Sequence, residues 1–254
     1  MTLRIGWYTT RGRSSRAMFE AVLDAIRAGT LDAEIAYVFS NRDPGDDPIT
    51  DAFFDLVRAE GIPLLALGSV AYRKTHGGER SKPGEPLPPW REAYDREVAR
   101  LVDQHPADLG VLAGYMLIFT AEFTESHPLV NLHPALPGGP VGTWTEVILE
   151  LLRSGASESG VMLNVAIPEV DMGPVVAFCR YPIQTTSVDP HASDEALEAS
   201  PAFEAIRAEQ VRHESPFLVA ALQAFATGRA SLGASDPLDL TEDVRARLAA
   251  AAGG

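Results

Sequence analysis

The feature that most constrains the fold is an alternation of short apolar runs with longer segments of helical periodicity. Residues 3–9, 34–39 and 108–113 are mostly apolar and are predicted as buried strands. Residues 49–59 and 90–102 place apolar side chains at helical spacing. Alternating strands and helices with short links are typical of an α/β fold, so we predict an open, mostly parallel twisted sheet with helices on both faces.

The second half of the chain continues this pattern. We expect one domain over residues 1–232, followed by a tail or a terminal helix over 233–254. Residues 68–89 are rich in glycine, proline and basic residues, which predicts a long loop that is either a linker or a lid. Further predicted elements are a helix at 144–153, strands at 160–167 and 175–183, a surface loop with a possible helical turn at 184–201, and a helix at 201–228.

Composition bounds the class of protein. The hydrophobic share of 46% is sufficient for a core, and no apolar run is long enough to span a membrane. The net charge of -14 argues against a nucleic-acid surface, although a local basic pocket is compatible with it. The single cysteine, Cys179, excludes an internal disulfide and a cysteine zinc cluster. The start shows no signal-peptide layout, so a cytoplasmic enzyme or binding protein is expected.

Three polar residues carry the strongest chemical signal. The run Pro128–Val130 predicts the end of a buried strand that delivers Asn131 and His133 on one side of the chain. An amide donor, an imidazole and an orienting carboxylate such as Asp171 are the groups that acyl transfer requires. The alternatives are a structural histidine beside Pro134 and an Asx turn at Asp171.

A second candidate site follows the first strand. The loop includes Gly12, Arg13, Ser14 and Ser15, and it leads into an apolar-periodic helix. A strand, a loop of small residues and a helix start predict an anion site, because free amides and the positive helix end point outward. The alternative is an ordinary helix cap with solvated arginines.

Five blocks of sequence resemble, in order and approximate spacing, the formyltransferases that use 10-formyltetrahydrofolate. Within that family the phosphoribosylglycinamide formyltransferases are most similar, over about the first 230 residues. The blocks are Val38–Arg42, Arg91–Glu97, Leu112–Met116, Asn131–Pro134 and Asp171–Pro174. The resemblance implies the family's Rossmann-like fold and a catalytic role for Asn131, His133 and Asp171.

The resemblance also implies two sets of binding residues. The acceptor side is expected to involve Gly12, Arg13, Ser14, Ser15, Arg91 and Pro134. The folate side is expected to involve Tyr115, Met116, Leu117, Ile118 and Asn164. On the sequence alone, Arg91 is instead expected to be an exposed helix residue paired with Asp95.

The chain departs from the family at several of these positions. Leu117 stands where similar proteins often have arginine, and Asn164 stands where many have histidine. The phosphate loop differs from the family's usual form, and so does the proline-rich loop after His133. These differences leave the identity of the acceptor open.

The resemblance implies formyl transfer from 10-formyltetrahydrofolate to the amine of a phosphorylated small molecule, with glycinamide ribonucleotide favoured. Neither a metal nor a nucleic-acid or membrane partner is expected, and a homodimer is left open. Three alternatives stand beside this reading: a formyltetrahydrofolate hydrolase, a sugar-nucleotide N-formyltransferase, and a non-catalytic folate or nucleotide binding module.

Overall fold

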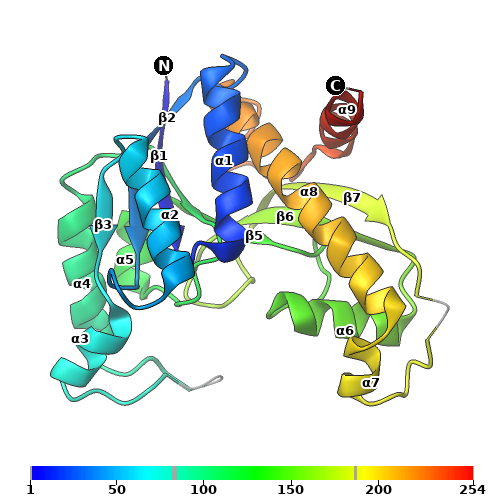
Figure 1. Cartoon of the computed structure of the whole chain (residues 1–254), viewed down its shortest axis with the longest axis horizontal. Coiled ribbons are helices and arrows are strands. Elements are labelled where there is room, and N and C mark those ends of the chain that lie inside the picture. Colours follow the sequence, from blue (N-terminus) through cyan, green and yellow to red (C-terminus); the bar gives the residue numbers. More distant parts are fainter. Residues whose placement is uncertain (1, 82–84, 186–187, 254) are drawn as a thin grey trace. The chain divides into compact units, whose positions relative to one another are not determined.

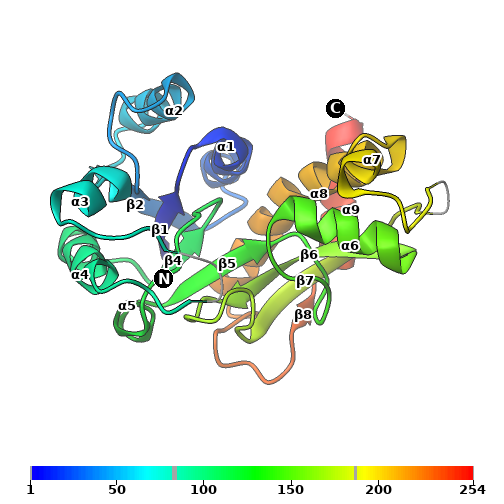
Figure 2. The same ribbon diagram turned by 90° about the horizontal axis from the view of Figure 1, so that it is seen from below.

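The computed structural model describes residues 2–81, 85–185 and 188–253, with only the backbone described at Arg13 and Ser14. The chain forms two compact units. The first contains Met1–Glu20, Asp32–Asn131 and Ala166–Glu169, and the second contains Ala21–Leu31, Leu132–Val165 and Val170–Gly254. Each unit contains both strands and helices (Figures 1 and 2).

The elements follow one another as β1 (Leu3–Thr9), α1 (Arg13–Arg27), β2 (Ala33–Ser40), α2 (Pro48–Ala59), β3 (Leu64–Ala66), α3 (Ser69–Thr75), α4 (Trp90–Val102), β4 (Leu109–Leu112), α5 (Ala121–Ser126), β5 (Leu129–His133), α6 (Trp144–Ser154), β6 (Glu158–Val165), β7 (Val175–Pro182), α7 (Asp194–Glu198), α8 (Pro201–Ala226), β8 (Leu238–Asp239) and α9 (Thr241–Ala252).

The first unit contains a parallel sheet in the order β3-β2-β1-β4-β5. Consecutive side chains on a strand point to opposite faces, so Trp7 and Tyr8 of β1 enter different layers of the core. Trp7 packs edge-on against Phe19 of α1, and Phe19 packs against Phe53 of α2. These contacts place α1 and α2 against one face of this sheet.

The other face of this sheet is covered by α4 and α5. Tyr8 and Phe39 pack there with Tyr94 of α4 and Phe123 of α5 in one buried cluster. Figure 2 shows α2 on one side of β1 and β2, with α4 and α5 on the other. The predicted mostly parallel α/β sheet with helices on both faces is therefore confirmed.

The second unit is built on β6 and β7, which pair antiparallel, and β8 pairs parallel with β7. Helix α8 packs on β6 and β7, and α6, α7 and α9 pack against α8 (Figure 1). The start of α6 is a capping box, in which Thr143 and Glu146 satisfy each other's backbone N–H groups. Its end is Gly155 in the left-handed conformation that favours glycine.

Three segments differ from the expected form or decide between two expected forms. The long loop predicted for 68–89 is wrong over Ser69–Thr75, which forms α3, and its residues 82–84 lie outside the described residues. Helix α5 was not predicted at all, since its single short turn carries no apolar period. Within 233–254, where a tail or a terminal helix was expected, the structure has the terminal helix, because α9 packs on β7 and buries Val244.

No helix in the described ranges combines the length and the apolar character needed to cross a membrane.

Gly160 of β6 offers a test of this packing. A Cβ atom there would lie 2.2 Å from the backbone oxygen of Cys179 on β7 and 2.5 Å from Leu136 Cδ2. Gly160→Ala is therefore expected to lower the free energy of unfolding by about 2–3 kcal/mol, as overpacking does. Urea denaturation followed by circular dichroism measures this loss.

The matched control is Gly233→Ala. No atom lies within 4 Å of a Cβ atom built at Gly233. This variant is expected to change the free energy of unfolding by less than about 0.5 kcal/mol. Equal stability of the two variants would contradict the packing described for β6 and β7.

Candidate active site

His133 is the last residue of β5, and its ring is held from two sides within the second unit. Its Nδ1 lies 3.4 Å from Asp171 Oδ2, and the exposed fractions of the two side chains are 3% and 6%. Its Nε2 lies 2.8 Å from the carbonyl oxygen of Pro140. Both ring nitrogens face oxygen acceptors, so the doubly protonated imidazolium satisfies both contacts.

Asp171 is itself fixed by the backbone. Its φ of 55° lies in the left-handed region, where aspartate is tolerated better than most residues. Its Oδ2 accepts a hydrogen bond of 3.1 Å from the backbone N–H of Gly142. The carboxylate therefore joins the turn after β6 to the proline-rich loop after His133. The structure thus brings Asp171 to His133, in a position from which the carboxylate can orient the imidazole.

Asn131 lies two residues before His133 on β5 and is partly buried. Side chains two apart on a strand point to the same side, so the amide of Asn131 and the imidazole of His133 share one side of β5. An amide N–H and an imidazolium N–H can both donate hydrogen bonds to an oxyanion. This pair is the part of the site that local sequence determines.

The loop after β1 has the expected glycine turn. Gly12 has a φ of 69°, and a Cβ atom there would lie 2.6 Å from Phe53 Cβ. Only glycine therefore fits this close approach to α2. Helix α1 begins at the next residue, which confirms the strand, loop and helix order of the predicted anion site.

Ser15 differs from its neighbours in this loop. It is buried, and its Oγ accepts a hydrogen bond of 2.8 Å from Trp7 Nε1. Any contact of Ser15 with a ligand is therefore limited to its backbone N–H. The side chains of Arg13 and Ser14, which were also predicted as ligands, lie outside what the structure describes.

Residues 114–118, expected to face the folate, form a loop at the carboxyl end of β4. The backbone N–H of Met116 donates to Thr10 Oγ1 at 2.8 Å, and the N–H of Thr10 donates to the oxygen of Gly114. Tyr115 is buried, whereas Met116 is 67% exposed. Leu117 and Ile118 are partly exposed, so three consecutive residues of this loop reach solvent.

Arg91 corrects a prediction. It was expected to be exposed, but it is buried in the first unit beside Asp95, with Nη2 3.8 Å from Asp95 Oδ1. Its Nη2 also donates to the carbonyl oxygen of Ile118. Arg91 fills the space under the loop and fixes its end. The predicted pairing with Asp95 is confirmed, and the exposed position is wrong because α4 turns this face toward the core.

The pairing with Arg91 does not remove the cost of burying Asp95. Burial raises the pKa of Asp95 above its ordinary value. The backbone N–H of Thr120, which donates to Asp95 Oδ2 at 2.7 Å, and the Arg91 guanidinium act in the opposite direction. The carboxylate thus depends on these donors for its charged form.

Two remaining predicted residues lie in the second unit. Asn164 of β6 is buried, and within the described residues its amide oxygen Oδ1 has no hydrogen-bond donor. The carbonyl oxygen of Pro134 accepts a hydrogen bond of 3.4 Å from Gln210 Nε2 of α8. Pro134 is therefore anchored by its backbone, which fixes the start of the proline-rich loop.

Sequence reasoning missed the backbone partners of the site. Pro140 contributes its oxygen to His133, and Gly142 contributes its N–H to Asp171. The available signal was the density of proline and glycine in residues 134–142, which predicts a rigid loop but not its contacts. Among the residues that the structure describes, no group of three histidine, cysteine or acidic side chains could hold a metal ion.

Comparison with known proteins identifies one matching family. The family described as formyl transferase matches residues 12–208. The phosphoribosylglycinamide formyltransferase of Schizosaccharomyces pombe is 31% identical over 195 residues, which cover 72% of this chain and 84% of that protein. The protein of the same name from Escherichia coli (strain K12) is 29% identical over 167 residues, covering 65% of this chain and 67% of that protein.

Solved structures agree on the fold. Glycinamide ribonucleotide transformylase 1 from Symbiobacterium toebii has a TM-score of 0.62 at 23% identity, covering 90% of this chain and 89% of that one. A formyltetrahydrofolate deformylase from Pseudomonas syringae pv. tomato has a TM-score of 0.63 at 21% identity, covering 90% of this chain and 63% of that one. At these identities the likeness concerns the fold alone.

Arg91→Met tests the buried pair. The variant leaves the Asp95 carboxylate buried without its cation, so the free energy of unfolding is expected to fall by about 3–5 kcal/mol. Adding Asp95→Asn should recover part of that loss. Chemical denaturation of the single and double variants measures both effects.

The control for this prediction is Arg96→Ala on the same helix. Arg96 pairs with Glu122 at the surface, where 55% of the arginine side chain is exposed. Its removal is expected to cost less than about 1 kcal/mol. A loss for Arg91→Met no larger than this would show that the buried pair does not stabilise α4.

Proposed function

Because the chain belongs to the formyl transferase family, we propose that it transfers a formyl group from 10-formyltetrahydrofolate to the amine of a phosphorylated small molecule. Glycinamide ribonucleotide is the favoured acceptor, since it is the substrate implied by the names of similar proteins. The observation that supports this chemistry best is the contact of His133 with Asp171. His133 lies two residues after Asn131 on β5.

The first step is attack of the acceptor's neutral amine on the formyl carbon. The carbonyl oxygen gains negative charge as the tetrahedral intermediate forms. The amide of Asn131 donates a hydrogen bond to this oxyanion, and the imidazolium of His133 stabilises it. Asp171 lies at Nδ1, so Nε2 is the nitrogen that faces the reacting atoms. In the present geometry Nε2 donates to Pro140, and the substrate replaces that carbonyl as acceptor.

The second step breaks the bond between the formyl carbon and N10 of the folate. The attacking nitrogen loses one proton, and N10 gains one as tetrahydrofolate leaves, so no proton is consumed. The imidazolium of His133 gives its Nε2 proton to N10, and the neutral ring then takes the proton that the attacking nitrogen loses. Asp171 keeps the ring oriented while its charge changes. The side chains of His133 and Asp171 are almost fully buried, which limits the access of water to the pair.

Binding of the two substrates is assigned to the loops that follow the strands. The backbone amides at Gly12 and Ser15, with Arg13 and Ser14, are proposed to hold the acceptor's phosphate at the start of α1. The main chain at Tyr115–Ile118 is proposed to hold the folate ring, with Asn164 supplying a further amide. Arg91 is proposed to act indirectly, because it holds Ile118 and with it the loop of residues 114–118. Pro134 is proposed to act by fixing the start of the proline-rich loop.

Three wider expectations accompany this proposal. A net charge of -14 and a single buried cysteine are compatible with a cytoplasmic enzyme. A homodimer is a compatible assembly. The chemistry requires no metal, because Asn131 and His133 supply the donors to the oxyanion.

The test follows tetrahydrofolate, formylated glycinamide ribonucleotide and formate together, using wild type, His133→Ala and Asn131→Ala. Wild type is expected to release tetrahydrofolate in step with formylated product and without formate. Loss of one oxyanion donor is expected to lower kcat on the order of a hundredfold. The control is His191→Ala, an exposed histidine outside the site, which should keep wild-type turnover.

Each other outcome contradicts a specific part of the proposal. Formate without formylated product would indicate a hydrolase. Folate binding without release of tetrahydrofolate would indicate another acceptor or a binding protein. Wild-type turnover in His133→Ala would remove His133 from the mechanism.

A further inference from the structure

A cavity lies in the first unit, at the amino end of β5, opposite to the end that carries Asn131. Its volume is about 370 Å³, and its lining residues lie at the ends of α4 and α5 and at the starts of β4 and β5. This volume is within the range of small-molecule sites, about 300–1,000 Å³. The lining combines buried hydroxyls, the contact of His127 with Asp103, and apolar walls. The catalytic mechanism uses none of these groups.

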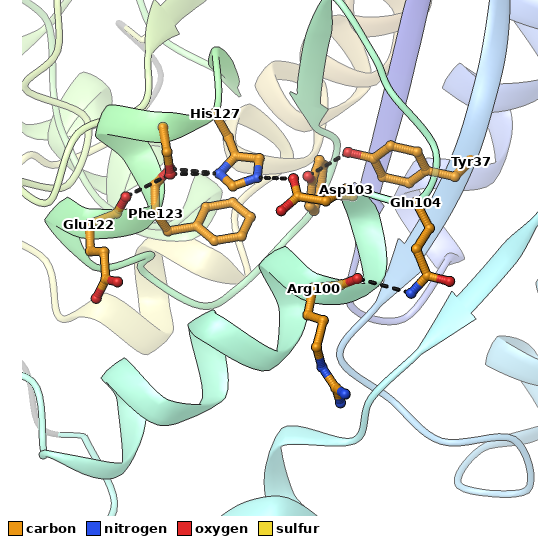
Figure 3. A network of polar contacts seen from close by, with 9 residues as sticks. Tyr37, Arg100, Asp103, Gln104, Glu122, Phe123 and His127 are labelled. Atoms are coloured by element: carbon orange, nitrogen blue, oxygen red, sulfur yellow. Dashed lines mark hydrogen bonds and ion pairs between the residues drawn. The ribbon is translucent and has the colours of Figure 1, made fainter.

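The rim of the cavity is a contact between the residues that directly follow α4 and α5. His127 Nε2 lies 3.1 Å from Asp103 Oδ1, and His127 Nδ1 lies 3.0 Å from the oxygen of Phe123. The hydroxyl of Ser126, 3.0 Å from the same nitrogen, can donate to it, so a neutral ring that donates from Nε2 to Asp103 satisfies these contacts (Figure 3). Among the described residues, Asp103 Oδ2 has no hydrogen bond or ion pair, and the side chain is 67% exposed. Asp103 Oδ2 is therefore available to accept a hydrogen bond from a ligand.

The floor of the cavity is a pair of tyrosines. The hydroxyl groups of Tyr8 and Tyr37 lie 2.6 Å apart and are buried. The pair has two protons and one mutual hydrogen bond, so one O–H can donate further. Burial raises the pKa of Tyr37 to about 12, which keeps its hydroxyl protonated at neutral pH. Gly6 makes room for this floor, since a Cβ atom there would lie 2.4 Å from Tyr37 Oη.

The shape of the walls and the local electrostatic potential determine which ligand fits. The rings of Tyr8, Tyr37 and His127 line the cavity with Pro106 and Pro128, so flat surfaces bound it. Two helix carboxyl ends meet there, and their partial negative charge favours cations. The tyrosine faces attract cations as well. With Asp103 at the rim, the site favours a flat group that carries N–H donors and positive charge.

We propose that this cavity is a second binding site, which takes a small planar aromatic cation through its N–H donors to Asp103. The ligand's ring lies between the apolar walls, and its far edge reaches the tyrosine hydroxyls. An anion of the same shape is excluded, because Asp103 and the helix ends repel it. The site lies at the amino end of β5 and does not depend on the formyl-transfer proposal.

The test titrates benzamidine into the full-length, isotope-labelled protein and follows the backbone amides by NMR. Benzoate has the same shape with opposite charge and serves as the ligand control. Benzamidine is expected to shift the resonances of Gly110, His127 and Leu129 in a saturable way, and benzoate should leave them unchanged. Asp103→Asn should weaken benzamidine binding about tenfold, as expected for loss of one charge-assisted hydrogen bond.

Two further variants keep the result decisive. Asp55→Asn removes an exposed carboxylate that pairs with Arg58 on α2, and it should bind benzamidine like wild type. Ala107→Leu narrows the cavity without changing its charge, and it should abolish the shifts even if Asp103→Asn unfolds. The proposal is overturned if benzamidine produces no saturable shift, if benzoate produces the same shifts, or if both cavity variants bind like wild type.

Discussion

The contact on which the candidate site depends is the ion pair of His133 and Asp171. Neither residue stands near the other in sequence, and a buried imidazole beside a buried carboxylate is stable only when both keep their partners. Pro140 supplies the partner at Nε2, and the N–H of Gly142 supplies a partner for Asp171. The proline-rich loop therefore has a structural reason for its rigidity, because a mobile loop would remove one partner from each of the two side chains.

In the first unit, the exposed loop of residues 114–118 is held in one conformation. Met116 stands open to solvent, so its side chain does not fix residues 114–118, whereas Tyr115 is buried in the core cluster. The loop is further fixed by Thr10 from the neighbouring loop and by the Arg91 guanidinium beneath it. Burying that guanidinium required a carboxylate, and Asp95 one turn along α4 supplies it.

Much of this was predictable where the signal is local. The strands, the glycine turn at Gly12 and the shared side of Asn131 and His133 follow from apolar runs, from small residues before a helix and from strand alternation. The burial of Arg91 was not predictable, since an arginine near a helix start is usually solvated and only tertiary packing shows which face turns inward. The partners Pro140 and Gly142 act through backbone groups, which sequence patterns do not distinguish.

The measurement that tests this account most directly is the protonation of the two His133 ring nitrogens, read from ¹⁵N NMR of histidine-labelled protein. The account predicts that both carry protons, Nε2 bonded to the oxygen of Pro140 and Nδ1 paired with Asp171. Replacing the carboxylate in Asp171→Asn should remove the proton at Nδ1. A neutral ring in the wild-type protein, with the same spectrum in Asp171→Asn, would contradict the proposed role of the pair.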